Sequence, residues 1–272
     1  MCGLAQVGGL SRGALTGSLR VLDYDREAAR YDVTRGGDAR ADAAANAIET
    51  LLPAVAGDVA RIADAGCGTG IVTVRLLRPG RSVIGIDRSA GMAAVAAGRL
   101  PGRITLGTAT RLPLASGSVD VVTMVWLLHL LPAAAAAAAI AEAGRVLSPG
   151  GLLITTVGKN DAAFDRADDD AAAIVGPVRA RFGPDQTDRL GRVADIGGQH
   201  GLALAARTTF VGRGQGTSPR PWRKRLAEDA VAWVGAAGRE QVDALCAQVA
   251  ELPDQDRARP DPVYQLAALR KG

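Results

Sequence analysis

Residues 59–70 read VARIADAGCGTG, and this stretch decides the fold. A short apolar run with one polar break is typical of a buried strand, and the glycines after it mark a turn. Apolar residues then recur over residues 71–77, which predicts a helix closed by Pro79 and Gly80. The stretch therefore predicts a strand, a glycine turn and a helix in succession.

The glycine turn, residues 66–70, is suited to hold a ligand. Gly66, Gly68 and Gly70 permit backbone conformations closed to other residues, and they let a ligand approach without meeting a side chain. The next apolar run ends at Asp87, at about the distance where doubly wound nucleotide sites place a ribose-binding carboxylate. Two successive strand ends are therefore expected to face one crevice.

The glycine spacing departs from the dinucleotide fingerprint. That fingerprint reads G-x-G-x-x-G, whereas this turn reads G-x-G-x-G, with the third glycine one residue early. Asp64, just before the turn, adds a second carboxylate, which would repel a pyrophosphate and attract an ammonium group. The turn is therefore predicted to bind a zwitterionic or cationic nucleoside rather than a nicotinamide dinucleotide.

These residues resemble the class I S-adenosylmethionine-dependent methyltransferases. The first motif of that family is similar to DAGCGTG at residues 64–70, and the second to IDRS at residues 86–89. Residues 107–113 resemble the adenine-side loop of the family, and residues 119–122 resemble its fourth strand. Residues 144–151 resemble its turn into the fifth strand. The resemblance covers residues 24–157 well. It implies an α/β fold: a doubly wound, Rossmann-like, mostly parallel sheet of about seven strands, with an antiparallel last strand and a helical substrate cover.

The resemblance implies S-adenosyl-L-methionine as cofactor and S-adenosyl-L-homocysteine as product. Asp87 would bind the ribose hydroxyls, Asp64 would orient the methionine ammonium through the turn, and Met92 would lie against the adenine. Thr108 stands where the family carries an aspartate, so a weaker neutral acceptor is expected for the adenine amino group. The residues expected to hold the cofactor are Tyr31, Arg35, Asp64, Ala65, Gly66, Cys67, Gly68, Gly70, Asp87, Arg88, Met92, Thr108, Ala109, Thr110, Val125 and Trp126.

A catalytic candidate follows the fourth expected strand, residues 119–125. Open α/β sheets hold ligands at the carboxyl ends of their strands, so the loop over residues 126–132 should meet the transferable methyl group. His129 could act there as a general base, because imidazole titrates near neutral pH. A histidine that only orients the loop is the alternative, and the sequence leaves both open.

The segments around this core are expected to be helical covers. Residues 24–35 resemble the part of the family that folds over the cofactor, with Tyr31 and Arg35 as lid residues and Arg35 able to pair with the methionine carboxylate. An ordinary surface helix is the alternative. The expected organisation is a disordered tail over residues 1–20 and a single methyltransferase domain over residues 21–272, with a helical lid over 21–52 and an inserted substrate cover over 158–188.

The remaining elements are predicted from periodicity. Helices are expected over residues 39–52, 90–99, 133–143, 188–200, 222–234 and 239–252, and further strands over residues 103–107, 152–157, 202–211 and 263–269.

The composition of the chain limits the classes of molecule that it is expected to bind. Lys and Arg number 32 against 28 acidic residues, a net charge of +4, which is too mild to indicate a nucleic acid partner. The three cysteines lack C-x-x-C spacing and a nearby histidine, so a reducing cytoplasm is expected and no metal site. The aspartates at 168–170 are better explained as a solvated helix face. The apolar run at residues 121–131 is short of the roughly 20 residues that span a bilayer.

The predicted function is methyl transfer by in-line displacement to a small-molecule acceptor, a natural product or a quinone-like ring of secondary metabolism. The alternatives are a nicotinamide oxidoreductase, which would explain the glycine turn and Asp87 but not the early third glycine, a protein of the same fold that binds S-adenosylmethionine without methylating, and a nucleic acid methyltransferase. The identity of the acceptor, the atom methylated and the oligomeric state, with a homodimer among the options, stay open.

Overall fold

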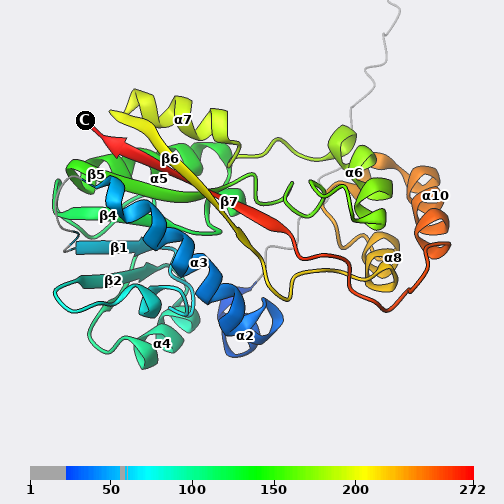
Figure 1. The fold of residues 1–272 in the computed structure, drawn as a ribbon, viewed down its shortest axis with the longest axis horizontal. Coiled ribbons are helices and arrows are strands. Elements are labelled where there is room, and N and C mark those ends of the chain that lie inside the picture. The colour runs from blue at the N-terminus through cyan, green and yellow to red at the C-terminus, as the bar shows by residue number, and fades with distance from the viewer. Residues whose placement is uncertain (1–22, 56–58, 60) are drawn as a thin grey trace, which may run out of the picture.

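A computed structural model describes residues 23–55, 59 and 61–272 of the 272-residue chain. A sheet is built from β1 Arg61–Ala65, β2 Ser82–Asp87, β3 Ile104–Leu106, β4 Val119–Met124, β5 Leu147–Val157, β6 Leu202–Val211 and β7 Val263–Lys271. The strand order is β3-β2-β1-β4-β5-β7-β6 (Figure 1). Strands β1 to β5 pair in parallel, and β7 is antiparallel to both β5 and β6. The predicted doubly wound sheet with an antiparallel last strand is confirmed.

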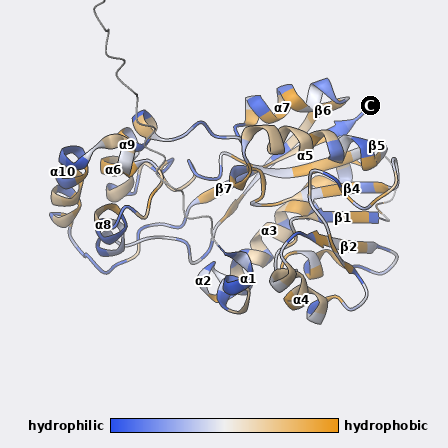
Figure 2. Cartoon of the chain, turned by 180° about the vertical axis from the view of Figure 1, so that it is seen from behind, coloured by the Kyte–Doolittle hydropathy of each residue, from blue (hydrophilic) through white to orange (hydrophobic). Residues whose placement is uncertain are grey.

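Two apolar cores cover the two faces of this sheet. Neighbouring strand residues alternate between them, so Ile62 lies in one core and Ala63 in the other. Helix α3 (Gly37–Leu51) packs in the first core, and α5 (Ala133–Val146) and α7 (Leu190–Gln199) pack in the second. Apolar colour runs along the central strands in Figure 2. Burial on both faces explains why these strands read as nearly continuous apolar runs.

The chain after the glycine turn differs from the prediction. A helix was expected over residues 71–77, but the structure has only a 3₁₀ helix, η3, at Thr73–Leu76. Three of the residues after the turn, Val72, Thr73 and Val74, are β-branched, which disfavours a helix, and Pro79 leaves no room for further turns. The helices expected over residues 39–52 and 90–99 are confirmed as α3 and α4 (Ala90–Arg99).

The segment before α3 is a broken helix rather than a continuous one. It consists of α1 Tyr24–Glu27, η1 Ala28–Arg30 and α2 Tyr31–Thr34, and a second 3₁₀ helix, η2 Leu52–Ala54, follows α3. The expected tail over residues 1–20 lies outside the described residues. Among the described helices, none has the length and apolar content to cross a bilayer.

Four helices form a lobe beside the sheet, here called the helical lobe. They are α6 Asp170–Phe182, α8 Pro219–Ala227, α9 Val234–Ala237 and α10 Arg239–Ala250. Their apolar core is separate from the two sheet cores and contains Ala171, Val175, Trp222, Leu226, Trp233, Val234, Val242, Leu245 and Val249. The chain enters the lobe after β5 and β6 and returns from it into β7, so the lobe joins the sheet at the carboxyl ends of its parallel strands (Figure 1).

The segment predicted as the substrate cover, residues 158–188, supplies only α6 of this lobe. The single helix expected over residues 222–234 is interrupted between α8 and α9. Asp229 there has a φ of 49°, a left-handed conformation that a continuous helix cannot include.

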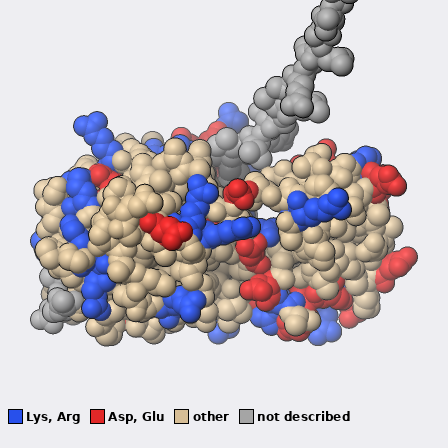
Figure 3. All heavy atoms as spheres, turned by 90° about the horizontal axis from the view of Figure 1, so that it is seen from above, with Lys and Arg blue, Asp and Glu red and all other residues tan. Residues whose placement is uncertain are grey.

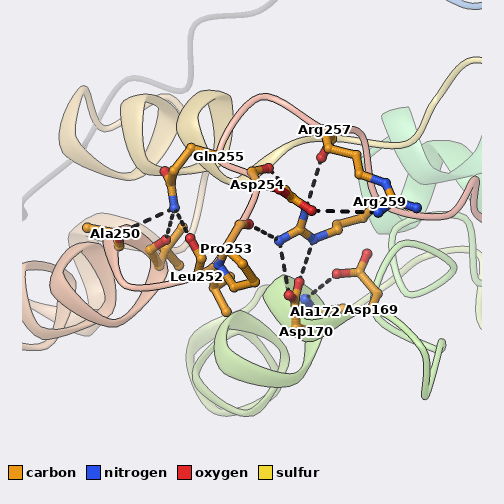
Figure 4. A network of polar contacts seen from close by, with 11 residues as sticks. Asp169, Asp170, Ala172, Ala250, Leu252, Pro253, Asp254, Gln255, Arg257 and Arg259 are labelled. Carbon is orange, nitrogen blue, oxygen red and sulfur yellow. Dashed lines mark hydrogen bonds and ion pairs between the residues drawn. The ribbon is translucent and has the colours of Figure 1, made fainter.

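A buried arginine ties the lobe together. The Arg259 guanidinium donates from Nε and Nη2 to the two carboxylate oxygens of Asp170, at 2.5 and 3.0 Å. It also donates to the carbonyls of Pro253, Asp254 and Arg257 (Figure 4). Since Asp170 begins α6, this network fastens the loop after α10 to the start of α6.

Candidate cofactor and acceptor site

The three glycines of the turn have different roles. A Cβ on Gly66 would lie 2.8 Å from a Leu127 methyl carbon, and one on Gly70 would lie 3.0 Å from Ala96 Cβ, so these two permit close packing. Gly68 has a φ of 56°, and a Cβ there would meet no atom within 4 Å. The middle of the turn therefore presents bare backbone to open space, as a ligand cradle requires.

Asp87 lies directly beside this turn, as predicted. One carboxylate oxygen accepts a hydrogen bond from the Gly68 N–H at 2.8 Å, and the other accepts from the Ser89 N–H at 2.9 Å. Asp87 is half-buried, so its remaining lone pairs can accept from a ligand hydroxyl. The end of β2 and the glycine turn thus form one polar corner.

The other residues of the first two motifs are mostly packed inward. Ala65 and Cys67 are buried, and the Cys67 sulfur fills the space beside Gly85. Burial raises the pKa of the Cys67 thiol, so it is no nucleophile. Arg88 is exposed. The backbone N–H groups of Gly66 and Cys67 both donate to the Ile86 carbonyl, and contact of residues 65–67 and Arg88 with a cofactor stays a prediction.

Asp64 acts on the turn from beneath it. Its carboxylate is 4% exposed and accepts hydrogen bonds from the hydroxyls of Thr73 at 2.6 Å and Thr123 at 2.7 Å. Burial raises its pKa, and the two hydroxyls oppose that shift. Asp64 therefore fastens η3 and β4 to β1 below the turn, and any effect on a ligand ammonium passes through that turn.

The loop after β3 is the expected adenine side. The Thr108 hydroxyl is 3.0 Å from the Thr110 hydroxyl, and the Thr110 N–H lies 3.3 Å from Thr108 Oγ1. Thr108 is exposed, and Ala109 and Thr110 are half-buried. Met92 is 1% exposed and presents almost no surface to this loop. Contact of these four residues with an adenine stays a prediction.

The N-terminal segment is fastened over the same corner by two carboxylates that the sequence reading missed. The Asp32 carboxylate accepts from the Thr69 hydroxyl and from Arg99, each at 2.6 Å. Asp25 accepts from the Ser89 hydroxyl at 2.6 Å. Nothing in the local sequence distinguishes these aspartates from the other acidic residues of a surface helix.

Tyr31 and Arg35 belong to this fastened segment. Tyr31 is half-buried, and the Arg35 guanidinium, which is exposed, lies 5.7 Å from the centre of the Tyr31 ring. Arg35 forms no ion pair with the described residues. Contact of these two side chains with a cofactor stays a prediction.

The loop after β4 carries an aromatic group. Trp126 has a φ of 55°, which is rare for a bulky residue and occurs at functional or strained sites. The backbone N–H of Trp126 donates to the Thr156 hydroxyl at 2.6 Å, and this hydrogen bond holds the backbone in place. The indole packs edge-on to Phe210 and Tyr264, and the Arg40 guanidinium lies 3.5 Å from its ring centre. Sequence periodicity did not indicate that β6 and β7 would contribute aromatic rings here.

His129 lies on η4 (Leu128–Leu130), beyond Val125 at the end of β4. Its Nδ1 is buried and has no partner among the described residues. Burial first, and then the positive charges of Lys159 and Arg40, hold the pKa of His129 well below its usual value. The imidazole is therefore neutral at pH 7, and the same surroundings disfavour its protonated form, so a role as general base stays a prediction.

The corner formed by the glycine turn and Asp87 fits a nucleoside. It offers bare backbone at Gly68, a carboxylate that can accept from ribose hydroxyls, and a cover fastened by Asp25 and Asp32. It does not fit a metal ion, since no group of three or more His, Cys, Asp or Glu side chains suited to a metal occurs in the described part of the chain.

Comparison with known proteins agrees with this geometry. The methyltransferase domain family matches residues 63–155, which include the turn and Asp87. An uncharacterised methyltransferase of Mycobacterium tuberculosis is 42% identical over 108 residues, 39% of this chain and 42% of that protein. An uncharacterised methyltransferase of Geobacillus kaustophilus is 31% identical over 160 residues, 54% of this chain and 71% of that protein.

A demethylmenaquinone methyltransferase of Beutenbergia cavernae is 40% identical over 96 residues, 35% of this chain and 39% of that protein. The matched part of the chain thus spans less than half the length of the mycobacterial and Beutenbergia relatives. Among solved structures, the cyclase SpnF superposes with a TM-score of 0.53 and 21% identity, over 91% of this chain and 93% of that one. This last likeness shows the fold alone.

The family match falls on the strands and the glycine turn that form the cofactor corner, and the Geobacillus relative is covered over most of its own length. The chain therefore belongs to the class I S-adenosylmethionine-dependent methyltransferases.

Proposed function

We propose that this protein transfers the methyl group of S-adenosylmethionine to a small-molecule acceptor. The observation that carries the proposal is the corner where the open backbone of Gly68 meets the Asp87 carboxylate. Within the same fold, the loop after β4 brings Trp126 and His129 to the carboxyl ends of the strands. A cofactor site and an acceptor site would then meet at the edge of β1 and β4, where open α/β sheets bind ligands.

The cofactor supplies an electrophilic methyl group on a sulfonium, which a nucleophilic acceptor atom attacks in line. Asp87 would hold the ribose, and the turn would hold the methionine end. His129 is the candidate to accept the proton that a hydroxyl or amine acceptor releases, and it would do so as a weak base, because burial and two nearby cations disfavour the imidazolium. Because methyl transfer depends mainly on positioning and on the exclusion of water, this chain needs no stronger acid or base.

Several features favour a small acceptor. The helical lobe stands at the carboxyl ends of the strands, where it would cover a bound molecule, and one relative is named a demethylmenaquinone methyltransferase. On the face seen in Figure 3, basic side chains lie mainly on the left half and acidic ones mainly on the right half. The net charge of +4 is mild for a protein that binds a nucleic acid. A natural product or a quinone-like ring of secondary metabolism fits these features. A cytoplasmic location and a homodimer stay predictions.

The first test is calorimetric titration with S-adenosylhomocysteine. A Gly68→Arg side chain would fill the open space above the turn, so affinity should fall at least ~100-fold. Gly117→Arg is the matched control, since Gly117 also has a positive φ, of 64°, and open surroundings, but lies before β4 at the other edge of the sheet. Equal affinity in wild type and Gly68→Arg would contradict the cofactor site.

A second measurement distinguishes methyl transfer from the alternative, in which the protein binds the cofactor without methylating a substrate. Transfer of a labelled methyl group would be followed across a panel of quinones and phenolic natural products. Tight binding of S-adenosylhomocysteine without transfer to any acceptor, and with conversion of a substrate to an isomer, would favour the non-methylating alternative. Transfer to RNA or DNA in place of these acceptors would favour the nucleic acid alternative.

A further inference from the structure

Arg40, in the first turn of α3, is a buried cation without a counter-ion. Arg40 is 6% exposed, and its guanidinium lies flat against Trp126 with one nitrogen donating to the Arg35 carbonyl at 2.8 Å. Nε is buried and has no hydrogen-bond partner, and no carboxylate of the described residues forms an ion pair with this side chain. The Tyr264 hydroxyl is its other neighbour.

Lys159, two residues after β5, is a half-buried cation that also forms no ion pair with the described residues. Among the described residues, the Lys159 ammonium donates a hydrogen bond only to the Asn160 side-chain oxygen, at 3.4 Å. Burial, and then the charges of Arg40 and Arg35, lower the pKa of Lys159 to about 8, in spite of an attraction to Asp188. Asp188 uses one oxygen to accept from the Lys159 backbone N–H at 2.8 Å rather than to pair with the ammonium.

Two other little-exposed arginines among the described residues are paired with carboxylates. Arg259, with an 8% exposed side chain, is held by Asp170 (Figure 4), and Arg179, with 13%, is held by Asp161. A buried cation left without a partner costs several kcal/mol. An unbalanced cation is therefore expected where a ligand supplies the missing negative charge.

The two cations lie on the acceptor side of the sheet. The cofactor corner is formed by β1 and β2, whereas Arg40 packs on the loop after β4 and Lys159 follows β5, on the other side of β1 in the strand order. Phe210 at the end of β6 and Tyr264 at the start of β7 complete the surroundings. The pair is thus set apart from the residues that would hold the adenosine.

We propose that Arg40 and Lys159 bind an acidic group of the methyl acceptor, so that the acceptor is an organic anion, with a carboxylate near an apolar or aromatic body. This rests on the proposed function, because it assigns the acceptor half of that site. Guanidinium and ammonium groups bind carboxylates by charge-assisted hydrogen bonds, and the aromatic residues Trp126 and Tyr264 supply the adjoining apolar surface.

The test uses matched pairs of acids and neutral amides: benzoate and benzamide, 2-naphthoate and 2-naphthamide, decanoate and decanamide. Each is titrated into wild type, Arg40→Gln, Lys159→Gln and the control Arg207→Gln, with S-adenosylhomocysteine saturating. Arg207 is an exposed β6 residue with no described ion pair. At least one acid should bind wild type roughly 10- to 100-fold more tightly than its amide, and either cluster variant should remove this preference.

Affinity for S-adenosylhomocysteine shows whether a variant has lost acceptor binding alone or has also lost its fold or its cofactor site. Affinity for S-adenosylhomocysteine should stay within about twofold in both cluster variants, which also shows that they fold. If no acid is preferred over its amide, or if the preference survives both variants, the proposal is wrong.

The proposal is also wrong if both variants lose S-adenosylhomocysteine affinity while keeping affinity for 5′-methylthioadenosine, which lacks the amino acid part. In that case the cations hold the cofactor carboxylate, and the proposed methyl transfer still stands. If the wild-type protein binds neither S-adenosylhomocysteine nor 5′-methylthioadenosine, the proposed function is wrong.

Discussion

Replacing Thr123 by Val tests how the chain supports the glycine turn. The Thr123 hydroxyl donates to the Asp64 carboxylate at 2.7 Å, and this carboxylate is 4% exposed. Water cannot replace the lost donor at such a buried oxygen, and hydrogen bonds to charged groups contribute about 1.5–3 kcal/mol. We therefore expect Thr123→Val to lower the free energy of unfolding by about 1.5–3 kcal/mol at neutral pH.

A matched control lies on the adjacent strand. Thr155 is equally buried, but its hydroxyl donates to the neutral carbonyl of Met124 at 2.9 Å. Thr155→Val should therefore cost only about 0.5–1.5 kcal/mol. Equilibrium urea unfolding followed by circular dichroism measures both differences, and the midpoint shift at constant slope reports the change in stability.

The two variants should also differ in pH dependence. Burial raises the folded-state pKa of Asp64 above its unfolded value, so the stability contribution of this group falls as pH rises through the folded pKa. The Thr123 hydroxyl limits that rise in pKa, and without it the folded pKa moves further up. The penalty of Thr123→Val should therefore shrink as the pH is lowered through the folded pKa of Asp64, whereas that of Thr155→Val should stay constant. Equal penalties, or a Thr123→Val penalty that grows on acidification, would refute the reasoning.

Two further predictions concern the N-terminal segment and the lobe. Asp32→Asn weakens the hydrogen bonds that Asp32 accepts from Thr69 and Arg99. Because these groups are partly exposed, the substitution should lower stability by only ~1 kcal/mol. Tryptic cleavage near residue 30 should become faster, while the far-ultraviolet circular dichroism spectrum stays unchanged. Arg259→Met removes the bidentate pair with Asp170 and should destabilise the helical lobe by about 2–3 kcal/mol, since the arginine is buried but its partner is partly exposed. Hydrogen exchange should then accelerate in α6 and α10 but not in β1 or β4, and uniform acceleration in lobe and sheet would contradict a separate lobe core.

The sequence predicted the sheet and the corner at Asp87 because both depend on local patterns. Apolar runs of strand length mark the central strands, and glycines mark the turn between β1 and η3. The carboxyl ends of adjacent parallel strands necessarily meet at one edge, so the contact between Asp87 and the turn followed from order alone. The helix expected after the turn was wrong, because β-branched residues and Pro79 limit it to one 3₁₀ turn.

The remaining features join residues far apart in the chain, and no local pattern encodes them. Asp32 reaches Thr69, and Arg259 reaches back to Asp170 to close the lobe. Likewise, Arg40 is an unremarkable helix residue in the sequence, and only the packing of α3 on the loop after β4 buries its charge against Trp126.

The sequence by itself therefore determined the fold class and pointed to one edge of the sheet as the ligand site, because strand periodicity and turn chemistry are local properties. The identity of the cofactor came from the resemblance of these motifs to a family. The tertiary structure decided which carboxylates fasten the N-terminal segment, how Asp64 supports the turn, and which cations are left unpaired. The physical reason is that burial and ion pairing depend on the whole packed arrangement: a charge costs free energy only after its neighbours have excluded water and no partner has been supplied.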